Sequence, residues 1–327
     1  MRYERPVRTT DETPRETTGS SGVRQLEVSA DDVGQRIDNF LLRHFKSVPR
    51  SRVYRLLRRG EVRVNGKRAK PEYRLAAGDR LRLPPVRTGV DRPPARVPPT
   101  LIERVRAAIV HEDADLLVIN KPAGLAVHGG SGLDFGVIEA LRAARPEESL
   151  ELVHRLDRET SGCLLVARRR ASLRTLHALM REGAVEKRYL TLLAGQWQLG
   201  RKRIDVPLKT RQLQGGERMV KAHAGGKSSA SQFRPIQFYG KRATLMEVEI
   251  ETGRTHQIRV HAAYAGHPVA GDDKYGDRDL NAALRKLGLV RMFLHAHTIS
   301  FTWPESGREF TVSVPLDDDL KAVLDRL

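Results

Sequence analysis

The pattern of apolar and polar positions divides the chain into segments of different predicted structure. Residues 1–22 consist mostly of Thr, Glu, Arg, Ser and Gly, and such a composition is typical of a disordered tail. After Val23, large apolar residues recur at the spacing of a helix, at Ile37, Phe40, Leu41 and Phe45. We expect a second helix that begins at Ser51, a suitable N-cap, and ends at Gly60.

Short strands are predicted after the second helix. Residues 61–68 alternate around Asn65-Gly66, and this pair favours the two-residue type I′ turn of a hairpin. Another short strand is expected at Leu81 and Leu83. Two helices and a few short strands predict a compact domain over residues 23–83.

A proline-rich segment separates this domain from the rest of the chain. Six of the 17 prolines lie between residues 84 and 99, so residues 84–100 are expected to form a stiff, extended linker. In residues 101–327 the predicted strands and helices do not alternate regularly, which favours an α+β fold over a doubly wound sheet. The strands are expected near residues 116–120, 163–167, 244–249, 258–261 and 310–314, and the helices near 137–144 and 173–182.

The net charge of the chain is strongly positive and unevenly distributed. The chain has 58 Lys and Arg against 40 Asp and Glu, and residues 43–82 alone hold fourteen basic and three acidic residues. Such a cluster on a folded segment indicates a polyanionic partner. Nucleic acid is favoured over a membrane, because the sequence has neither a spanning segment nor a long basic amphipathic helix.

The second predicted helix offers the clearest face for binding nucleic acid. Its apolar residues Val53, Leu56 and Leu57 face a core while its arginines point elsewhere, an arrangement suited to phosphate contacts. The alternative is a basic face that is merely solvated. The candidate RNA-binding residues are Arg50, Arg52, Arg55, Arg58, Arg59, Arg63 and Lys67.

Cysteine and histidine usage argues against several kinds of site. The single Cys163 excludes an intrachain disulfide and a cysteine-based zinc site, and it suits a reducing, cytoplasmic location. The polar start of the chain predicts no signal peptide. We expect no metal site, because no carboxylate lies at a metal-binding spacing beside the clustered histidines.

A short polar motif is the strongest candidate for chemistry. Residues 154–162 read His-Arg-Leu-Asp-Arg-Glu-Thr-Ser-Gly and lead directly into the apolar run of a predicted strand. The lone carboxylate of Asp157 between two arginines is poor packing material, although a solvated charged turn would have the same sequence. A carboxylate is ionised at neutral pH and can act as a nucleophile without a general base. In a pocket that excludes water it needs a counter-charge, and Arg259, in a predicted strand, is a candidate.

Both domains contain segments that match known families. Segments 36–41, 51–52, 60–62 and 64–67 together are similar to the small RNA-binding domain called the alpha-L, or S-four-like, domain. Residues 154–162 resemble the signature motif of the RluA family of pseudouridine synthases, which act on uridines in ribosomal RNA. Further segments agree with that family, so that the resemblance covers nearly the whole chain: residues 120–124, 127–132, 136–142, 187–189, 253–261, 266–268 and 293–296.

The resemblance implies a fold, a reaction and roles for particular residues. The fold would be α+β, with a small basic S-four-like domain and a catalytic domain built on a mixed, largely antiparallel sheet. Asp157 would break the N-glycosidic bond of uridine, so that uracil turns and rejoins the ribose through C5. Tyr189 would stack beneath the extruded base and help to remove the C5 proton, while Arg259 would pair with Asp157. Arg155 would fill the space left by the flipped uridine, and Leu294 would line the base pocket.

The same resemblance implies a substrate and the absence of a cofactor. The expected partner is large-subunit (23S) ribosomal RNA or a pre-ribosomal particle, and the protein is expected to be a monomer. Attack of the carboxylate at C1′ and a glycal-type route are not distinguished. Further residues expected at the substrate are His154, Leu156, Arg254, His256 and Gln257.

Two other functions remain open from the sequence. A non-catalytic ribosome-assembly or rRNA-binding factor would use the same basic domain, with Asp157 as a structural partner of Arg259. A hydrolytic N-glycosidase is less favoured, because such enzymes use two facing carboxylates. Glu159 lies too near Asp157 in the sequence to face it across a sugar.

Overall fold

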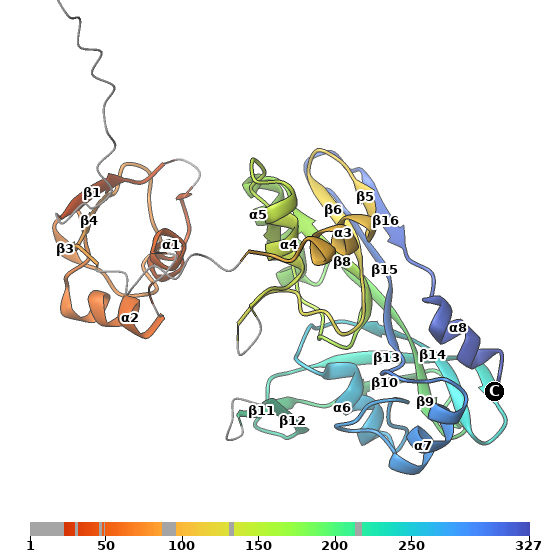
Figure 1. The fold of residues 1–327 in the computed structure, drawn as a ribbon. Helices are drawn as coiled ribbons and strands as arrows, with labels where there is room; N and C mark the ends of the chain where they lie inside the picture. Colours follow the sequence, from red (N-terminus) through yellow and green to blue (C-terminus); the bar gives the residue numbers. More distant parts are fainter. Residues whose placement is uncertain are drawn as a thin grey trace, which may run out of the picture. The chain divides into compact units, whose positions relative to one another are not determined.

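The chain folds into two compact units, Met1–Pro94 and Ala95–Leu327 (Figure 1). This computed structural model describes residues 23–29, 32–45, 48, 50–86, 96–130, 134–212 and 218–327. The expected tail at residues 1–22, and residues 87–95 of the expected linker, lie outside these ranges. Helix α3 (Pro99–Ala107) begins inside the expected linker, because Pro99 suits the first turn of a helix, where its missing N–H is not needed.

The N-terminal unit packs two helices against a small antiparallel sheet. The strand order of this sheet is β1-β4-β2-β3. The elements are β1 (Arg24–Glu27), α1 (Ile37–His44), α2 (Arg50–Arg59), β2 (Arg63–Val64), β3 (Lys67–Arg68) and β4 (Arg80–Leu83). One apolar core joins the helices and the sheet, and it includes Ile37, Phe40, Leu41, Val53, Leu56, Leu57 and Leu81.

Both predicted helices and the predicted hairpin of this unit are present. Helix α2 begins at Arg50, so Ser51 lies in its first turn and is not the N-cap that we expected. Asn65 and Gly66 have φ angles of 48° and 77°, and a type I′ turn requires positive φ at both positions. The buried carboxylate of Asp79 accepts a hydrogen bond from the Asn65 side chain at 2.8 Å, which ties the turn to the start of β4.

The C-terminal unit is built on a ten-stranded mixed sheet. Its main path runs β10-β13-β14-β9-β15-β8-β6-β5, with β16 added to β15 and β7 added to β8. Among the described residues β15 and β8 run parallel, and the other neighbours are antiparallel. The expected α+β class and largely antiparallel sheet are therefore confirmed.

Helices cover this sheet in two groups. Figure 1 shows α3, α4 and α5 gathered near β5, β6 and β8, while α6 and α7 lie towards β9 and β13. The strands are β5 (Ile109–Glu112), β6 (Leu116–Lys121), β7 (Glu151–Leu152), β8 (Ser161–Ala167), β9 (Glu186–Ala194), β10 (Lys202–Asp205), β13 (Ala230–Tyr239), β14 (Ala243–Ile250), β15 (Leu294–Thr302) and β16 (Glu309–Ser313). The helices after α3 are α4 (Val137–Ala144), α5 (Arg170–Glu182), α6 (Gln257–Tyr264), α7 (Arg278–Lys286) and α8 (Asp318–Leu324).

The prediction of a strand at residues 258–261 is wrong, because these residues lie in α6. Apolar and polar residues alternate there, and that alternation has the period of a half-buried strand. In the structure every residue from Gln257 to Ala262 is buried, the polar ones included. A helix that is enclosed on all sides loses the amphipathic period that would identify it.

Glycine is required where the two parallel strands meet. Gly162 pairs with Ala296 of β15 and has a φ angle of 103°. A Cβ atom on Gly162 would lie only 2.2 Å from the carbonyl oxygen of Ala296. The absence of a side chain therefore lets β8 approach β15 at the last residue of the motif at residues 154–162.

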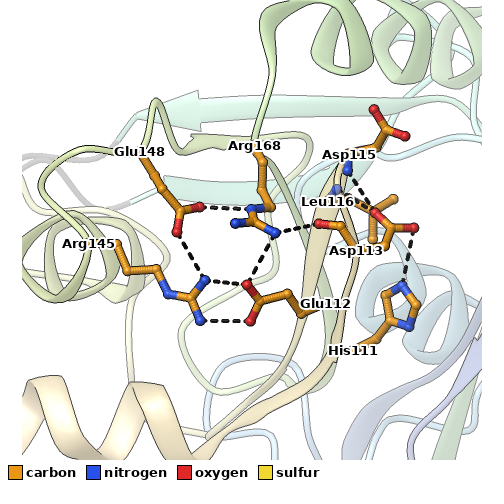
Figure 2. A network of polar contacts seen from close by, with 8 residues as sticks. All are labelled: His111, Glu112, Asp113, Asp115, Leu116, Arg145, Glu148 and Arg168. Carbon is orange, nitrogen blue, oxygen red and sulfur yellow. Dashed lines mark hydrogen bonds and ion pairs between the residues drawn. The ribbon is translucent and has the colours of Figure 1, made fainter.

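A ring of charged side chains lies at the β5 edge of the sheet (Figure 2). Arg145 binds both carboxylate oxygens of Glu112, at 2.5 and 2.7 Å, and also contacts Glu148 at 3.1 Å. Arg168 at the end of β8 bridges the same two glutamates, at 3.1 and 2.8 Å. This ring links β5 to β8 and to the segment that follows α4. Its four side chains form one extended network of ion pairs.

A separate two-stranded hairpin rests on α6. It consists of β11 (Leu208–Gln212) and β12 (Arg218–Ala222), paired antiparallel. Leu208 and Val220 pack with Val260 of α6 in a small apolar cluster, against which Tyr275 is also packed. The hairpin is therefore held on the helix that carries Arg259.

Candidate active site

The motif loop presents Asp157 to a cavity in the C-terminal unit. The cavity is lined by Arg155, Leu156 and Asp157 of the loop, by Tyr189 and Leu294 of the sheet, and by residues 253–259. Arg155 is exposed and Leu156 is buried. The structure therefore brings together segments that lie more than a hundred residues apart in the sequence.

A buried lysine holds the motif loop in place. The ammonium group of Lys121 donates hydrogen bonds to the carbonyl oxygens of Pro122, Leu125 and Arg158, at 2.9, 2.8 and 3.0 Å. The N–H of Gly124 donates to the same Arg158 oxygen at 2.9 Å. Because these bonds fix the backbone next to Asp157, the carboxylate is presented by a rigid loop.

Arg259 lies between two carboxylates. Its Nη1 is 3.5 Å from Oδ2 of Asp157, so the expected ion pair is present. Its closer partner is Asp272, to which Nε and Nη2 donate bonds of 2.7 and 2.8 Å. Burial alone would raise the pKa of Asp272, but the bonds from Arg259 and two backbone N–H groups hold that pKa below its ordinary value. The two bonds to Asp272 therefore hold the guanidinium of Arg259 in one orientation.

His256 and Tyr275 complete the surroundings of Asp157. The His256 Nε2 is 3.9 Å from Oδ2 of Asp157, and its Nδ1 is 2.9 Å from the Tyr275 hydroxyl. The Tyr275 ring lies 5.0 Å from the guanidinium carbon of Arg259. Burial lowers the pKa of His256 to about 4, so its imidazole is neutral at neutral pH.

An apolar wall faces the carboxylate. Tyr189 lies on β9 opposite Val248 of β14 and Ala296 of β15, and its side chain is buried. Leu294, the first residue of β15, is also buried and lines the cavity. Burial, together with the charge of Asp157, raises the pKa of Tyr189, so the phenol stays protonated at neutral pH. A flat aromatic face beside a carboxylate suits a planar, polar base.

Two residues expected at the substrate have their polar groups engaged with the protein. His154 does not line the cavity, because its Nε2 accepts a hydrogen bond from the Leu165 N–H at 3.1 Å. The Gln257 amide makes four hydrogen bonds, which use its two donors and both lone pairs of its oxygen. Both side chains therefore support the loop and β13 rather than offering groups to a ligand. Arg254 is exposed at the cavity and donates to the Ser228 carbonyl at 3.1 Å.

Sequence reasoning missed Asp272 and Tyr275. Both lie in the turn after α6, beyond the segments that had drawn attention. No motif or periodic pattern in the local sequence marks either residue. In the structure Gly271 passes close to the Arg291 backbone, since a Cβ there would lie 2.2 Å from the Arg291 carbonyl oxygen.

The basic face of the N-terminal unit is arranged as the sequence predicts. Val53, Leu56 and Leu57 are buried, while Arg55, Arg58 and Arg59 of the same helix are exposed. Arg52 is half-buried, and Arg63 and Lys67 of the hairpin are exposed. The side chain of Arg50 lies outside the described residues. An exposed guanidinium row beside a hairpin is suited to phosphate groups.

Neither a metal centre nor a membrane span is found among the described residues. Across those ranges, no group of three or more His, Cys, Asp or Glu side chains is placed to hold a metal ion. Within the same ranges, no helix combines the length and apolar character needed to cross a bilayer.

Comparisons with known proteins agree on one family. Residues 115–264 match the family described as RNA pseudouridylate synthase, and residues 35–81 match the S4 domain. The chain is 51% identical over 315 residues to an Escherichia coli protein named ribosomal large subunit pseudouridine synthase C, which covers 95% of this chain and 98% of that protein. A protein of the same name from Pasteurella multocida is 50% identical over 310 residues, or 94% of this chain and 95% of that one.

Solved structures agree with these sequence matches. Human RNA pseudouridylate synthase domain containing 4 superposes with a TM-score of 0.58 at 25% identity, over 69% of this chain and 95% of that one. Human RNA pseudouridylate synthase domain containing 1 gives 0.55 at 28% identity, over 66% and 86%.

Proposed function

The chain belongs to the RNA pseudouridylate synthase family, and from this premise we propose that it converts specific uridines of large-subunit ribosomal RNA to pseudouridine. One observation carries the proposal. The Asp157 carboxylate faces a cavity walled by Tyr189 and Leu294, and it is 3.5 Å from an arginine that is itself fixed by a second carboxylate. The near full-length similarity to proteins named for this reaction on the large ribosomal subunit supports the substrate.

The target uridine has to leave its stack before Asp157 can reach it. Flipping a base out of a helix costs a few kcal/mol, and stacking on an aromatic ring offsets part of that cost. Tyr189 supplies such a ring inside the cavity, and Leu156 and Leu294 add apolar surface. Arg155 is exposed and lines the cavity, and we propose that its side chain fills the space that the uridine leaves.

The reaction then exchanges one bond to the ribose for another. The bond from N1 to C1′ breaks, uracil rotates, and a bond from C5 to C1′ forms. C5 loses a proton and N1 gains one, so the product is an isomer of the substrate. Asp157 starts this sequence either by adding to C1′ or by taking a proton from the sugar, and both routes need its carboxylate ionised and aimed at the ribose.

The neighbours of Asp157 supply the electrostatic part of the proposal. The guanidinium of Arg259 stabilises the ionised carboxylate in a site from which the base displaces water. Because burial and the charge of Asp157 raise the pKa of Tyr189, its phenol offers a stacking face and a hydrogen-bond donor but is a poor acceptor for the C5 proton, in contrast to the role expected from the sequence. Asp157 is the carboxylate at the same cavity, and we assign the acceptor role to it.

The N-terminal unit is proposed to anchor the RNA. Its match to the S4 domain and its exposed arginines on α2 support contacts with phosphate groups. We propose that the protein acts without a cofactor, as a monomer in the cytoplasm, on ribosomal RNA or on a pre-ribosomal particle. The proposed absence of a cofactor follows from the reaction, which needs neither an oxidant nor an activated donor.

Product analysis tests this function against its alternatives. The protein is incubated with an unmodified large-subunit transcript that carries tritium at uridine C5, and the digested nucleosides are separated. Tritium release together with pseudouridine supports the proposal. Free uracil would indicate a hydrolytic N-glycosidase, and tight binding without release would indicate an assembly factor.

A further inference from the structure

A chain of polar contacts connects hairpin β11–β12 with Asp157. The backbone N–H of Val220 in β12 donates a hydrogen bond of 2.9 Å to the Tyr275 hydroxyl. That hydroxyl is 2.9 Å from Nδ1 of His256, and Nε2 of the same ring is 3.9 Å from Oδ2 of Asp157. One tyrosine therefore stands between a hairpin on the surface and the carboxylate in the cavity.

The directions of these hydrogen bonds can be assigned. The Val220 amide can only donate, so the Tyr275 oxygen accepts from it. Burial keeps the His256 imidazole neutral, and we assign its single proton to Nε2 because that nitrogen faces the Asp157 carboxylate at 3.9 Å. With Nδ1 then an acceptor, the Tyr275 hydroxyl donates to it. Oδ2 of Asp157 thus faces an imidazole N–H as well as the Arg259 guanidinium.

The backbone of His256 is held in an unusual conformation. Its φ angle is 53°, in the left-handed region that non-glycine residues seldom adopt, and it forms the N-cap of α6. Such a conformation persists only when the surroundings enforce it. The bond from Tyr275 is one of the contacts that does so, and the ring of Tyr275 also packs against Arg259 at 5.0 Å.

The hairpin carries charges suited to RNA. Lys209, Arg211 and Lys221 are exposed on its two strands. A groove lined by Lys209, Lys227 and Arg254 runs beside the hairpin and shares residues 253–255 with the cavity of Asp157. An RNA strand that binds these cations favours the arrangement in which the hairpin is docked on α6.

We propose that Tyr275 is a positioning residue that orients His256 and Arg259 towards Asp157 while hairpin β11–β12 is docked, and so couples RNA binding at the hairpin to the catalytic site. This inference rests on the proposed function for its catalytic readout. The hydroxyl is the essential group, because it joins β12 to His256. The aromatic ring of Tyr275, without its hydroxyl, is enough to keep the packing against Arg259 and against the apolar cluster of the hairpin.

The variant Tyr275→Phe separates the hydroxyl from the ring. We expect kcat to fall at least tenfold and the Kd for RNA to stay close to that of the wild type, while Tm falls only slightly because one buried N–H loses its partner. Amide hydrogen exchange at residues 218–222 should become faster, because the Val220 N–H loses its acceptor. The matched control is Tyr264→Phe, which removes a hydroxyl from a 63% exposed tyrosine on α6 and should change none of these quantities.

A double-mutant cycle tests whether Tyr275 acts through His256. Asparagine suits the left-handed backbone at position 256 but is too short to reach Asp157. In a His256→Asn background, Tyr275→Phe should have little further effect on kcat. A full additional tenfold loss there, an unchanged kcat in the single variant, or a loss that only follows Tm would each overturn the proposal. The exchange measurement needs no substrate, so it tests the coupling even if the wild type is inactive. An inactive wild type would refute the proposed function alone. Unchanged exchange at residues 218–222 in Tyr275→Phe would refute the coupling.

Discussion

At the scale of single residues, the cavity is organised around one oxygen of Asp157. Oδ2 is approached by Arg259 at 3.5 Å and by His256 at 3.9 Å. Neither distance is that of a short hydrogen bond, so these groups stabilise the charge of the Asp157 carboxylate without holding it in a hydrogen bond. Arg259 makes its two hydrogen bonds to Asp272 instead, and the side chain of Asp272 is completely buried. The arrangement leaves Asp157 available for reaction while its counter-charge stays in place.

Removal of the arginine should be costly mainly because of Asp272. Arg259→Ala leaves a fully buried carboxylate without its partner, and we expect the free energy of unfolding to fall by about 3–5 kcal/mol. Arg259→Lys keeps the charge but loses the two-point geometry, so its loss should be smaller. Urea unfolding of both variants provides the measurement. A loss of about 1 kcal/mol or less for Arg259→Ala, the size of an exposed pair, would contradict this account.

The half-buried histidine of the motif should make the protein sensitive to mild acid. Burial lowers the pKa of His154 to about 4, whereas in an unfolded chain a histidine titrates near its ordinary value of 6.5. Between these values the unfolded state binds a proton that the native state does not. Stability should therefore fall with decreasing pH, by about 2 kcal/mol between pH 7 and pH 5 from this group.

A glutamine substitution isolates the contribution of His154. In His154→Gln the side-chain oxygen can still accept from the Leu165 N–H, but the group no longer titrates. Urea unfolding followed from pH 7 to pH 5 should show a shallower loss than in the wild type. Identical pH profiles would mean that His154 is already protonated in the native state.

At the scale of elements, the site depends on the junction of two parallel strands. Strand β8 starts where the motif loop ends, and β15 starts at Leu294, so their junction sets the distance between Asp157 and the apolar wall. Gly162 permits the close approach of the two strands, and Lys121 holds the backbone of the motif loop that precedes β8. The ring of ion pairs in Figure 2 supports the same strand from its other end, through Arg168. The geometry of the cavity therefore depends on the position of the whole strand β8.

The junction can be tested with a single methyl group. Gly162→Ala places a Cβ 2.2 Å from the Ala296 carbonyl oxygen, and we expect a loss of about 3 kcal/mol or more, or failure to fold. Gly183→Ala is the matched control, because Gly183 also has a positive φ, of 74°, but its Cβ would meet nothing within 4 Å. That control should lose only the backbone cost of about 1–2 kcal/mol. Equal losses in both variants would contradict the close-approach argument.

At the scale of the whole molecule, the proposed function divides binding and chemistry between the two units. The N-terminal unit holds the exposed arginines of α2, and the C-terminal unit holds the cavity. Contacts with phosphate groups supply affinity that depends on salt but not on base sequence. In the proposed function, selection of a uridine belongs to the cavity lined by Asp157, Tyr189 and Leu294.

Neutralising the arginines of α2 should change the salt dependence of RNA binding. In the full-length chain, replacing Arg55, Arg58 and Arg59 with Gln should weaken binding and lower the slope of log K against log salt by about one for each of these arginines that binds a phosphate group. Replacing the exposed Lys241 of the C-terminal unit with Gln is the control and should leave the slope unchanged. A slope that stays the same in the triple variant would exclude α2 as the anchor.

Much of this organisation was accessible from the sequence, and the exceptions at the candidate site share one physical cause. Amphipathic helices, the Asn65-Gly66 turn and the basic face of α2 were predicted because local periodicity and turn chemistry specify them, although the starts of α2 and α3 were misplaced. The failures at the site concern α6 and its partners, where burial on all sides removes the periodic signal. His154, Gln257 and Asp272 are polar residues whose roles depend on what the tertiary fold places beside them. Local sequence does not contain that information.

The most direct test of the account is the activity of Asp157→Asn under single-turnover conditions. The variant keeps the shape of the side chain but removes the negative charge, and excess protein ensures that all of the C5-tritiated transcript is bound. We predict that tritium release and pseudouridine formation become undetectable while Tm and RNA affinity match those of the wild type. Release at the wild-type rate from the bound variant would contradict the central role of this carboxylate.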